Sequence, residues 1–281
     1  MSDGAESPSR LIASPDGNPI AVFSSGEGPP LVLVHGATAD HTTWRSAGPV
    51  LAEMFTIHAI DRRGRGASGD GRTYSIEREY EDLAAVAATL AAEAGRAVDI
   101  VGHSYGGRCA LGAALLGGDN IRRLVVYEGA PPPSGARAGY RPSGIERRIA
   151  DLIDAGDRDA ALATFMGEIV RMPPAELAAF RADPIWPIRA AAVHTTLREL
   201  EGEASPAASL EALATVQVPV LQLLGGESAP IFGEAIRALD ARLGDGRVVT
   251  IDGARHAAHH THVAAFVGAV RAFLQPADMA D

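Results

Sequence analysis

Residues 102–107 read Gly-His-Ser-Tyr-Gly-Gly and directly follow an apolar run at residues 98–101. A strand that runs into Gly-x-Ser-x-Gly and out into a helix-compatible segment places its serine on a sharp strand-to-helix turn. The glycines two residues before and after the serine leave space that side chains would otherwise fill. The turn exposes the hydroxyl beside the positive end of a helix, where a developing anion is stabilised. The pattern predicts Ser104 as a nucleophile, although a chain with 31 glycines also produces such a motif by chance.

A serine hydroxyl needs a base that accepts its proton, and histidine is the usual one. His256 lies in the loop after the last predicted strand, a position from which its ring can reach the serine. We expect His259, His260 and His262 to lie in the following helix and to turn progressively away. Their helical spacing also fits a metal site, but no acidic or cysteine ligand accompanies them apart from Asp252. We therefore favour His256 as the base and predict no metal.

Strand-length apolar segments alternate with helical patterns along the chain. Strands are predicted at residues 10–13, 19–23, 31–34, 56–60, 98–101, 124–127, 218–224 and 247–251. Helices are predicted near residues 42–53, 76–94, 105–116, 231–243 and 259–274. Several strands are apolar on both faces, as in a covered parallel sheet. The alternation predicts an α/β fold, a mostly parallel twisted sheet with helices on both faces.

One segment, residues 131–205, breaks this alternation. It contains no convincing strand and reads as short helices punctuated by prolines. An insertion at this point would cover the carboxyl ends of the strands, where open α/β sheets bind ligands. The sequence thus predicts a helical cap at 131–205 and a core formed by residues 1–130 and 206–281.

The chain resembles the α/β-hydrolase superfamily over nearly its whole length. The resemblance rests on Val-His-Gly-Ala-Thr at 34–38, the glycine-rich loop 61–69, the serine turn 102–107, and the His256 loop before a final amphipathic helix. The serine-acid-histidine order along the chain also fits that superfamily. The resemblance implies the α/β-hydrolase fold.

The resemblance also implies an oxyanion hole formed by the backbone N–H groups of Ala37 and Tyr105. Two fixed donors aimed at a developing oxyanion lower the barrier to acyl transfer by a few kcal/mol each, on the order of what one donor contributes in known enzymes.

The acid departs from the commonest pattern of that superfamily, which places an aspartate in a Gly-x-x-Asp loop after the penultimate strand. Here the loop 225–230 has Ser228 at that position, with Glu227 beside it. Some members use the end of the strand after the nucleophile helix, and here that strand ends at Glu128. A carboxylate there can reach the far nitrogen of His256, so we favour Glu128 over Glu227. The alternative for Glu128 is a loop carboxylate paired with an arginine.

The loop 64–69 also spells Gly-x-Gly-x-x-Gly after a strand. A dinucleotide site requires a helix that opens at once, and residues 70–74 instead prolong the loop. We predict a structural role for Asp61 and the neighbouring arginines in fixing turns, and no organic cofactor.

Apolar and aromatic residues of the predicted cap are candidates for a substrate pocket. Trp186, bracketed by two prolines, is the first choice, with Phe165 and His194 as weaker ones. The alternative is that such residues form the core of the cap itself.

Composition narrows the class of protein. The 281 residues are 47% hydrophobic and carry a net charge of −10, which disfavours nucleic acid or an anionic membrane as a partner. Cys109, the single cysteine, permits no intrachain disulfide and is expected to be a buried small residue. Residues 1–8 lack the features of a secretory signal and read as a short disordered tail, so we expect a cytoplasmic location.

These observations predict a serine hydrolase that cleaves small-molecule carboxylic esters or lactones through Ser104, His256, Glu128 and an acyl-enzyme. Hydrolysis of C–C bonds or thioesters and cofactor-free perhydrolysis remain open on the same residues. A different class, a non-catalytic ligand-binding or cyclisation-assisting protein with this fold, also remains open, because a fold does not fix a function. The sequence leaves the natural substrate and the oligomeric state open.

Overall fold

A computed structural model describes residues 7–133 and 141–275 of the chain. Most of the predicted N-terminal tail, residues 1–6, lies outside the described residues. Eight strands form one sheet in the order β1-β2-β4-β3-β5-β6-β7-β8. The strands are β1 (Arg10–Ala13), β2 (Pro19–Ser25), β3 (Pro30–Val34), β4 (Thr56–Ile60), β5 (Val98–His103), β6 (Ile121–Tyr127), β7 (Val220–Gly225) and β8 (Gly246–Ile251).

The sheet is mostly parallel. Only the pairs β1–β2 and β2–β4 are antiparallel among the strand pairs of the described chain. The parallel strands β3 and β5 lie at the centre of the sheet, and all five residues of β3 are buried. The predicted α/β class with a mostly parallel sheet is therefore confirmed.

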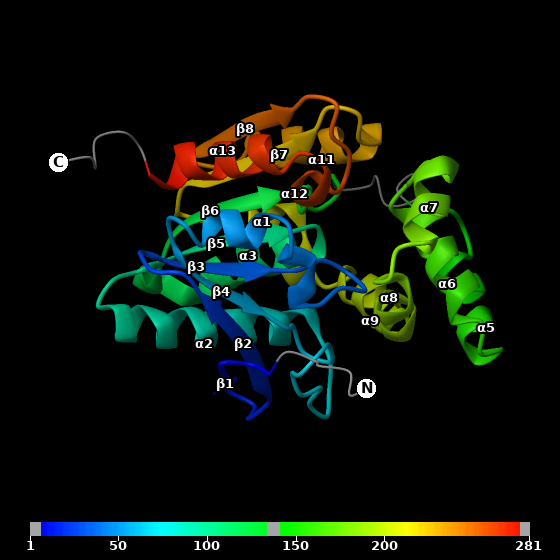
Figure 1. Cartoon of the computed structure of the whole chain (residues 1–281), viewed down its shortest axis with the longest axis horizontal. Coiled ribbons are helices and arrows are strands. Elements are labelled where there is room, and N and C mark those ends of the chain that lie inside the picture. The colour runs from blue at the N-terminus through cyan, green and yellow to red at the C-terminus, as the bar shows by residue number, and fades with distance from the viewer. Residues whose placement is uncertain (1–6, 134–140, 276–281) are drawn as a thin grey trace.

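Helices cover both faces of this sheet (Figure 1). Side chains of α2 (Ile76–Ala94), α3 (Tyr105–Gly117), α10 (Leu210–Leu213) and α11 (Pro230–Asp240) pack into one hydrophobic core. Side chains of α1 (Ala47–Leu51) and α13 (Val263–Leu274) pack into a second core on the opposite face. Short turns complete these layers: η1 (His41–Trp44), η2 (Gly118–Asn120), η4 (Pro206–Ala208) and α12 (Ala258–Thr261).

Local sequence explains where these helices begin and end. The Ser75 hydroxyl accepts a hydrogen bond from the Arg78 N–H at 3.3 Å and so caps α2. Gly95 ends the same helix with φ of 62°, a left-handed conformation that glycine adopts without penalty. Cys109 is buried in α3 within the first core, as expected from its position in the sequence.

Between β6 and β7 the described residues form helices and loops without a strand. We refer to α5–α9, residues 145–202, as the helical segment; Figure 1 shows it beyond the carboxyl ends of the parallel strands. Its elements are α5 (Ile145–Asp154), α6 (Arg158–Thr164), the π-helical turn η3 (Phe165–Ile169), α7 (Pro174–Arg181), α8 (Trp186–Ala192) and α9 (Thr195–Gly202). Part of the predicted boundary region, residues 134–140, lies outside the described residues.

Buried ion pairs join the helical segment to the loop that follows β4. Glu199 of α9 accepts hydrogen bonds from Arg62 and from Arg65, the latter at 2.5 Å. Glu79 of α2 adds a second carboxylate 3.7 Å from Arg62. All four side chains are at most 2% exposed, so each charge depends on its partners within the cluster.

None of the helices in the described parts of the chain has the length and apolar character needed to cross a membrane.

Candidate active site

Ser104 stands between β5 and α3 in a strained backbone conformation. Its φ of 53° and ψ of −123° lie where non-glycine residues are rare and cost about 1–3 kcal/mol. The Ser104 N–H donates to the Tyr127 carbonyl at 2.8 Å, which ties the turn to the neighbouring strand β6. A Cβ on Gly102 would lie 2.6 Å from the Gly106 carbonyl oxygen, and one on Gly106 would lie 2.3 Å from the His35 carbonyl oxygen. The two glycines thus allow the close backbone packing that this turn requires.

Glu128 and His256 are in direct contact. Glu128 Oε2 lies 2.5 Å from His256 Nδ1, and Glu128 Oε1 accepts the Gly225 N–H at 2.7 Å. Glu128 directly follows β6, and its side chain is fully buried. A carboxylate at this position holds the proton of the imidazole on Nδ1 and leaves Nε2 as a proton acceptor.

Neighbouring rings and backbone groups hold the His256 loop in place. The His103 ring donates from Nε2 to the His256 carbonyl at 2.7 Å. The Phe232 ring stacks on the His256 ring, with centroids 4.6 Å apart. The Tyr127 hydroxyl also holds this loop: it donates a hydrogen bond to the Arg255 carbonyl and accepts one from the Ala258 N–H.

Glu227, the alternative acid, lies elsewhere. Its carboxylate is 2.9 Å from Arg255 Nη2 and its side chain is 55% exposed. In the structure, therefore, Glu128 contacts the histidine. Glu227 is the carboxylate that pairs with an arginine, the role that the sequence left open as the alternative for Glu128.

Tyr105 is the first residue of α3, so its N–H is among those with no acceptor inside the helix. Ala37 follows Gly36 in the loop after β3. His35 fixes this loop as the tautomer with its proton on Nδ1. Its Nε2 accepts a hydrogen bond from the Arg62 N–H at 3.0 Å, and its Nδ1 donates to the Gly36 carbonyl at 2.8 Å. Burial, with the charge of Arg62, lowers the pKa of His35 well below its usual value and keeps the ring neutral.

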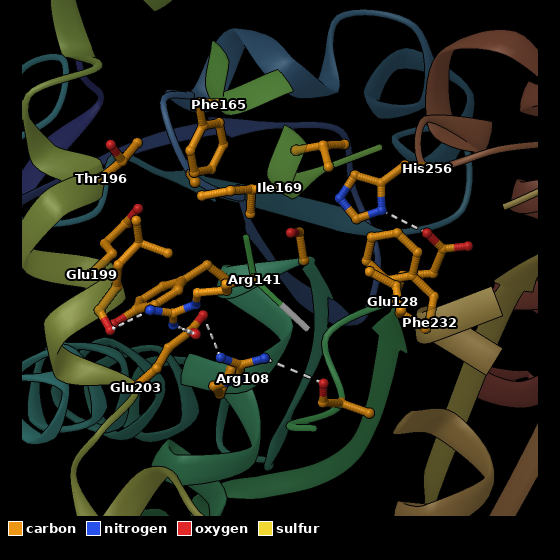
Figure 2. A pocket seen from close by; sticks show the side chains of 17 residues that line it. Arg108, Glu128, Arg141, Phe165, Ile169, Thr196, Glu199, Glu203, Phe232 and His256 are labelled. Atoms are coloured by element: carbon orange, nitrogen blue, oxygen red, sulfur yellow. Dashed lines mark hydrogen bonds and ion pairs between the residues drawn. The ribbon is translucent and has the colours of Figure 1, made fainter. Parts of the chain in front are cut away.

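Two cavities meet at Ser104 and His256. The smaller measures about 80 Å³ and is shown in Figure 2, where Glu128 and His256 point toward each other and α9 contributes Thr196 and Glu199 on the opposite wall. The larger measures about 340 Å³. Ala37 and Phe165 line both cavities, and Tyr105 lines the smaller one. The structure thus places Ser104, His256, Ala37 and Tyr105 around one cavity.

The comparison with known families decides which family this arrangement belongs to. Residues 31–269 match the sequence model described as the alpha/beta hydrolase family. The chain belongs to the alpha/beta hydrolase family. The resemblance inferred from the sequence is confirmed at the level of the family and the fold.

Individual relatives of this alpha/beta hydrolase differ in how much of their length is matched. A segment of 103 residues is 39% identical to the probable oxidoreductase EphD of Mycobacterium tuberculosis, but it covers 35% of this chain and only 17% of that protein. The 2-(acetamidomethylene)succinate hydrolase of Mesorhizobium japonicum is 29% identical over 251 residues, which is 84% of each chain. Among solved structures, an alpha/beta hydrolase of Sphaerobacter thermophilus is 33% identical, with a TM-score of 0.76, over 92% of this chain and all of the other.

His259 and His260 depart from the expectation that the histidines after His256 turn away. His259 of this alpha/beta hydrolase is 2% exposed, and its ring centroid lies 4.5 Å from that of His103. His259 and His260 both line the larger cavity. Burial lowers the pKa of His259 well below its usual value. Burial is also the main cause that lowers the pKa of His260 to about 4. These two histidines stay at the cavity because α12 begins at Ala258, directly after the His256 loop, so both remain close to His256 along the chain.

No group of three or more potential metal ligands occurs within residues 7–133 and 141–275. The metal alternative considered for the histidine cluster gains no support there.

Two of the three predicted pocket residues lie away from the two cavities. Trp186 is 5% exposed within the core of the helical segment and donates from Nε1 to Asp159 at 2.7 Å. His194 is exposed and contacts the Ala191 carbonyl at 3.0 Å. Phe165 does line both cavities. Trp186 matches the alternative interpretation, since it packs in the core of the helical segment at the start of α8, where Pro187 in the first turn is compatible with a helix.

The glycine-rich loop after β4 makes internal contacts. Asp61 accepts the His41 N–H and the Ala67 N–H, each at 2.8 Å. A Cβ on Gly66 would lie 2.0 Å from the Asp61 carboxylate. Helix α2 begins only at Ile76, so the loop does not open a helix at once as a dinucleotide-binding turn does.

Proposed function

We propose that this alpha/beta hydrolase cleaves carboxylic esters or lactones of small molecules through a Ser-His-Glu triad. The observation that carries the proposal is the 2.5 Å contact between Glu128 and His256 at the mouth of the cavities that Ser104 lines. A buried carboxylate on Nδ1 both orients the ring and stabilises the imidazolium that forms when Nε2 takes a proton.

In the proposed reaction, the Ser104 oxygen attacks the ester carbonyl while its proton passes to His256 Nε2. The N–H groups of Ala37 and Tyr105 donate to the oxyanion of the tetrahedral intermediate. As the intermediate collapses, the C–O bond breaks and His256 returns the proton to the leaving alkoxide, which leaves an acyl group on Ser104. Water then attacks the acyl-enzyme, with His256 again accepting and returning a proton, and the carboxylic acid is released. In a lactone the leaving alkoxide stays attached to the acyl group.

We propose that the helical segment acts as the cap of this site. Phe165 and Val170 line both cavities from the segment, and the buried pairs of Glu199 with Arg62 and Arg65 fix α9 to the loop after β4. Such a cap would exclude water and select substrates by shape.

The relative from Mesorhizobium japonicum is named a hydrolase of 2-(acetamidomethylene)succinate, which supports hydrolytic chemistry on a scaffold of this kind. Thioester, C–C and perhydrolytic reactions would use the same nucleophile, so a panel of acyl chain lengths, lactones and thioesters should follow the first test.

The first test is the substitution Ser104→Ala, assayed with an activated aryl ester. We expect loss of turnover, because alanine lacks the nucleophile. The melting temperature should stay unchanged or rise, because the substitution leaves the packing around the turn intact. Undiminished hydrolysis by the folded variant would rule out Ser104 as the nucleophile. A wild-type protein inert to every ester, lactone and thioester tested would favour the non-catalytic alternative.

A further inference from the structure

One cation in the larger cavity, the half-buried Arg189, differs from the buried arginines of this chain. Arg189 of α8 lines this cavity together with Ser104 and His256. Among the described residues, no carboxylate lies within ion-pair distance of its guanidinium. The fully buried arginines Arg62, Arg63, Arg65 and Arg108 all have such a partner.

The other charged side chains lining the larger cavity are neutralised. Asp183 lies 3.5 Å from Arg45, and it also accepts the Ile185 N–H at 2.9 Å. Glu176 lies 2.8 Å from Arg255. Within the described parts of the chain, the cavity beside the nucleophile therefore carries one positive charge without a counter-ion.

Arg189 retains unused hydrogen-bonding capacity. Its Nη2 donates to the Thr43 hydroxyl at 2.6 Å across the junction of α8 and η1, whereas its Nε is buried with no partner among the described residues. His260 lines the same cavity, and its Nε2 is also buried with no partner in the described parts of the chain. Because the Ser46 hydroxyl lies 3.1 Å from His260 Nδ1 and can donate to it, Nε2 can carry the ring proton and act as a donor.

Partial burial acts on Arg189 as expected for a cation with no counter-ion among the described residues. Desolvation lowers its pKa to about 10, although the charges of Asp40 and Asp183 oppose the shift. Asp40 is itself engaged as an acceptor for the Thr42 N–H at 3.0 Å. The positive charge of Arg189 also adds to the burial that lowers the pKa of His259.

Contacts of Trp186 anchor helix α8, which carries Arg189. Trp186 opens this helix, is fixed by its bond to Asp159, and packs edge-on against Phe180 with ring centroids 5.2 Å apart. A guanidinium presented from a packed helix binds a carboxylate with little loss of conformational entropy.

We propose that Arg189 binds a carboxylate of the substrate, so that the site acts on acidic esters or lactones that bear a free carboxylate besides the bond to be cleaved. The inference rests on the proposed hydrolase function for its choice of substrate. The subsite itself can be tested without turnover. Arg189 would be a binding residue, with His260 Nε2 as an additional donor to the same carboxylate.

The test measures binding of the glutarate dianion by calorimetry in the Ser104→Ala background, which stops turnover of any co-purified ester. We expect saturable binding that weakens with added salt. Arg189→Gln should lower the affinity by about 10- to 100-fold, because it removes a charge-assisted hydrogen bond to the carboxylate. Arg189→Lys should lower the affinity by less, because lysine keeps the positive charge.

Arg158→Gln is the matched control. Arg158 is an exposed arginine of the helical segment that donates to the Ala191 carbonyl of α8 at 2.9 Å and lines neither cavity. This control should change the affinity by less than about threefold, because it alters the net charge without touching the subsite.

Glutarate binding that is absent, or that is equally strong in Arg189→Gln and the parent, would overturn the proposal. The outcome is separable from the proposed function. If glutarate binding depends on Arg189 but the protein cleaves no ester, the proposed hydrolase function is wrong and the carboxylate subsite stands. If the protein hydrolyses neutral esters but its glutarate binding does not depend on Arg189, the hydrolase function stands and the subsite is wrong.

Discussion

Glu128 accepts a hydrogen bond from His256 at 2.5 Å, at the point where β6 ends beside β7. The backbone makes this contact possible at a cost, because Glu128 adopts a positive φ of 48°. Its N–H donates to the Leu223 carbonyl at 3.1 Å and its carboxylate accepts the Gly225 N–H. Strand β7 therefore fixes both the backbone and the side chain that orient the histidine.

From this relationship we expect Glu128→Gln to lower kcat for an aryl ester by about 10²- to 10⁴-fold, because an amide no longer stabilises the imidazolium or fixes its tautomer. Glu227→Gln, which removes only an exposed partner of Arg255, is the matched control and should change kcat by less than about threefold. Steady-state kinetics on both variants decides the matter. A large loss in Glu227→Gln with little in Glu128→Gln would show that the acid is misassigned.

The packing of the serine turn predicts opposite effects for two glycine-to-alanine substitutions. Gly106→Ala should destabilise the fold by about 2 kcal/mol or more, because its Cβ would overlap the carbonyl oxygens of His35 and Val34, which belong to the backbone. Gly268→Ala, on an exposed position of α13 with open space around it, should stabilise by about 0.5–1 kcal/mol. Urea unfolding measures both. Equal stability of the two variants would contradict the close approach of the turn to β3.

The cluster of buried charges at α9 gives a third prediction. Glu199→Gln should lower the free energy of unfolding by about 3 kcal/mol or more, since it leaves Arg62 and Arg65 with the more distant Glu79 as their only described carboxylate partner. Asp151→Asn, which removes an exposed pairing with Arg147 on α5, should produce no measurable change. Denaturant titrations of both variants provide the comparison. Unchanged stability in Glu199→Gln would mean that the cluster does not tie α9 to the core.

Acid sensitivity follows from His58 of β4. Burial, aided by the charge of Arg10, lowers the pKa of His58 to about 4, whereas the unfolded chain has the ordinary value of about 6.5. The unfolded state therefore binds the proton first, and the contribution of the neutral ring is complete above pH 6.5 and is lost as the pH falls toward 4. Between pH 7.5 and 5, the wild type should lose about 1–2 kcal/mol more stability than His58→Gln. Parallel losses in the two proteins would contradict a buried neutral His58.

Much of the fold could be predicted from the sequence because local signals carry it. Strands such as β3 are apolar on both faces, and the capped helix α2 begins after Ser75 and ends at Ala94, as its sequence pattern indicates. The glycines of the serine turn could be predicted for the same reason, because the need for residues without a side chain arises from the local sequence motif of the turn.

The remaining features depend on side chains that meet only in the folded chain. The place of Glu128 after the strand that follows the nucleophile helix favoured it over Glu227, but the contact itself depends on which loop approaches His256 in the folded chain. The sequence alone leaves Trp186 as either a pocket residue or part of the core of the cap, because its partner Asp159 lies 27 positions away on α6. That no described carboxylate pairs with Arg189 is likewise a property of its surroundings and cannot be inferred from the residues beside it in the sequence.

The most direct test of the central claim, that Ser104 is an activated nucleophile, is labelling of the native protein with a fluorophosphonate, read by intact mass and peptide mapping. The account predicts one label per chain on the peptide that contains Ser104, slower labelling in Glu128→Gln, and none in Ser104→Ala. Folded wild-type protein that stays unlabelled, or that carries the label on another residue, would contradict it.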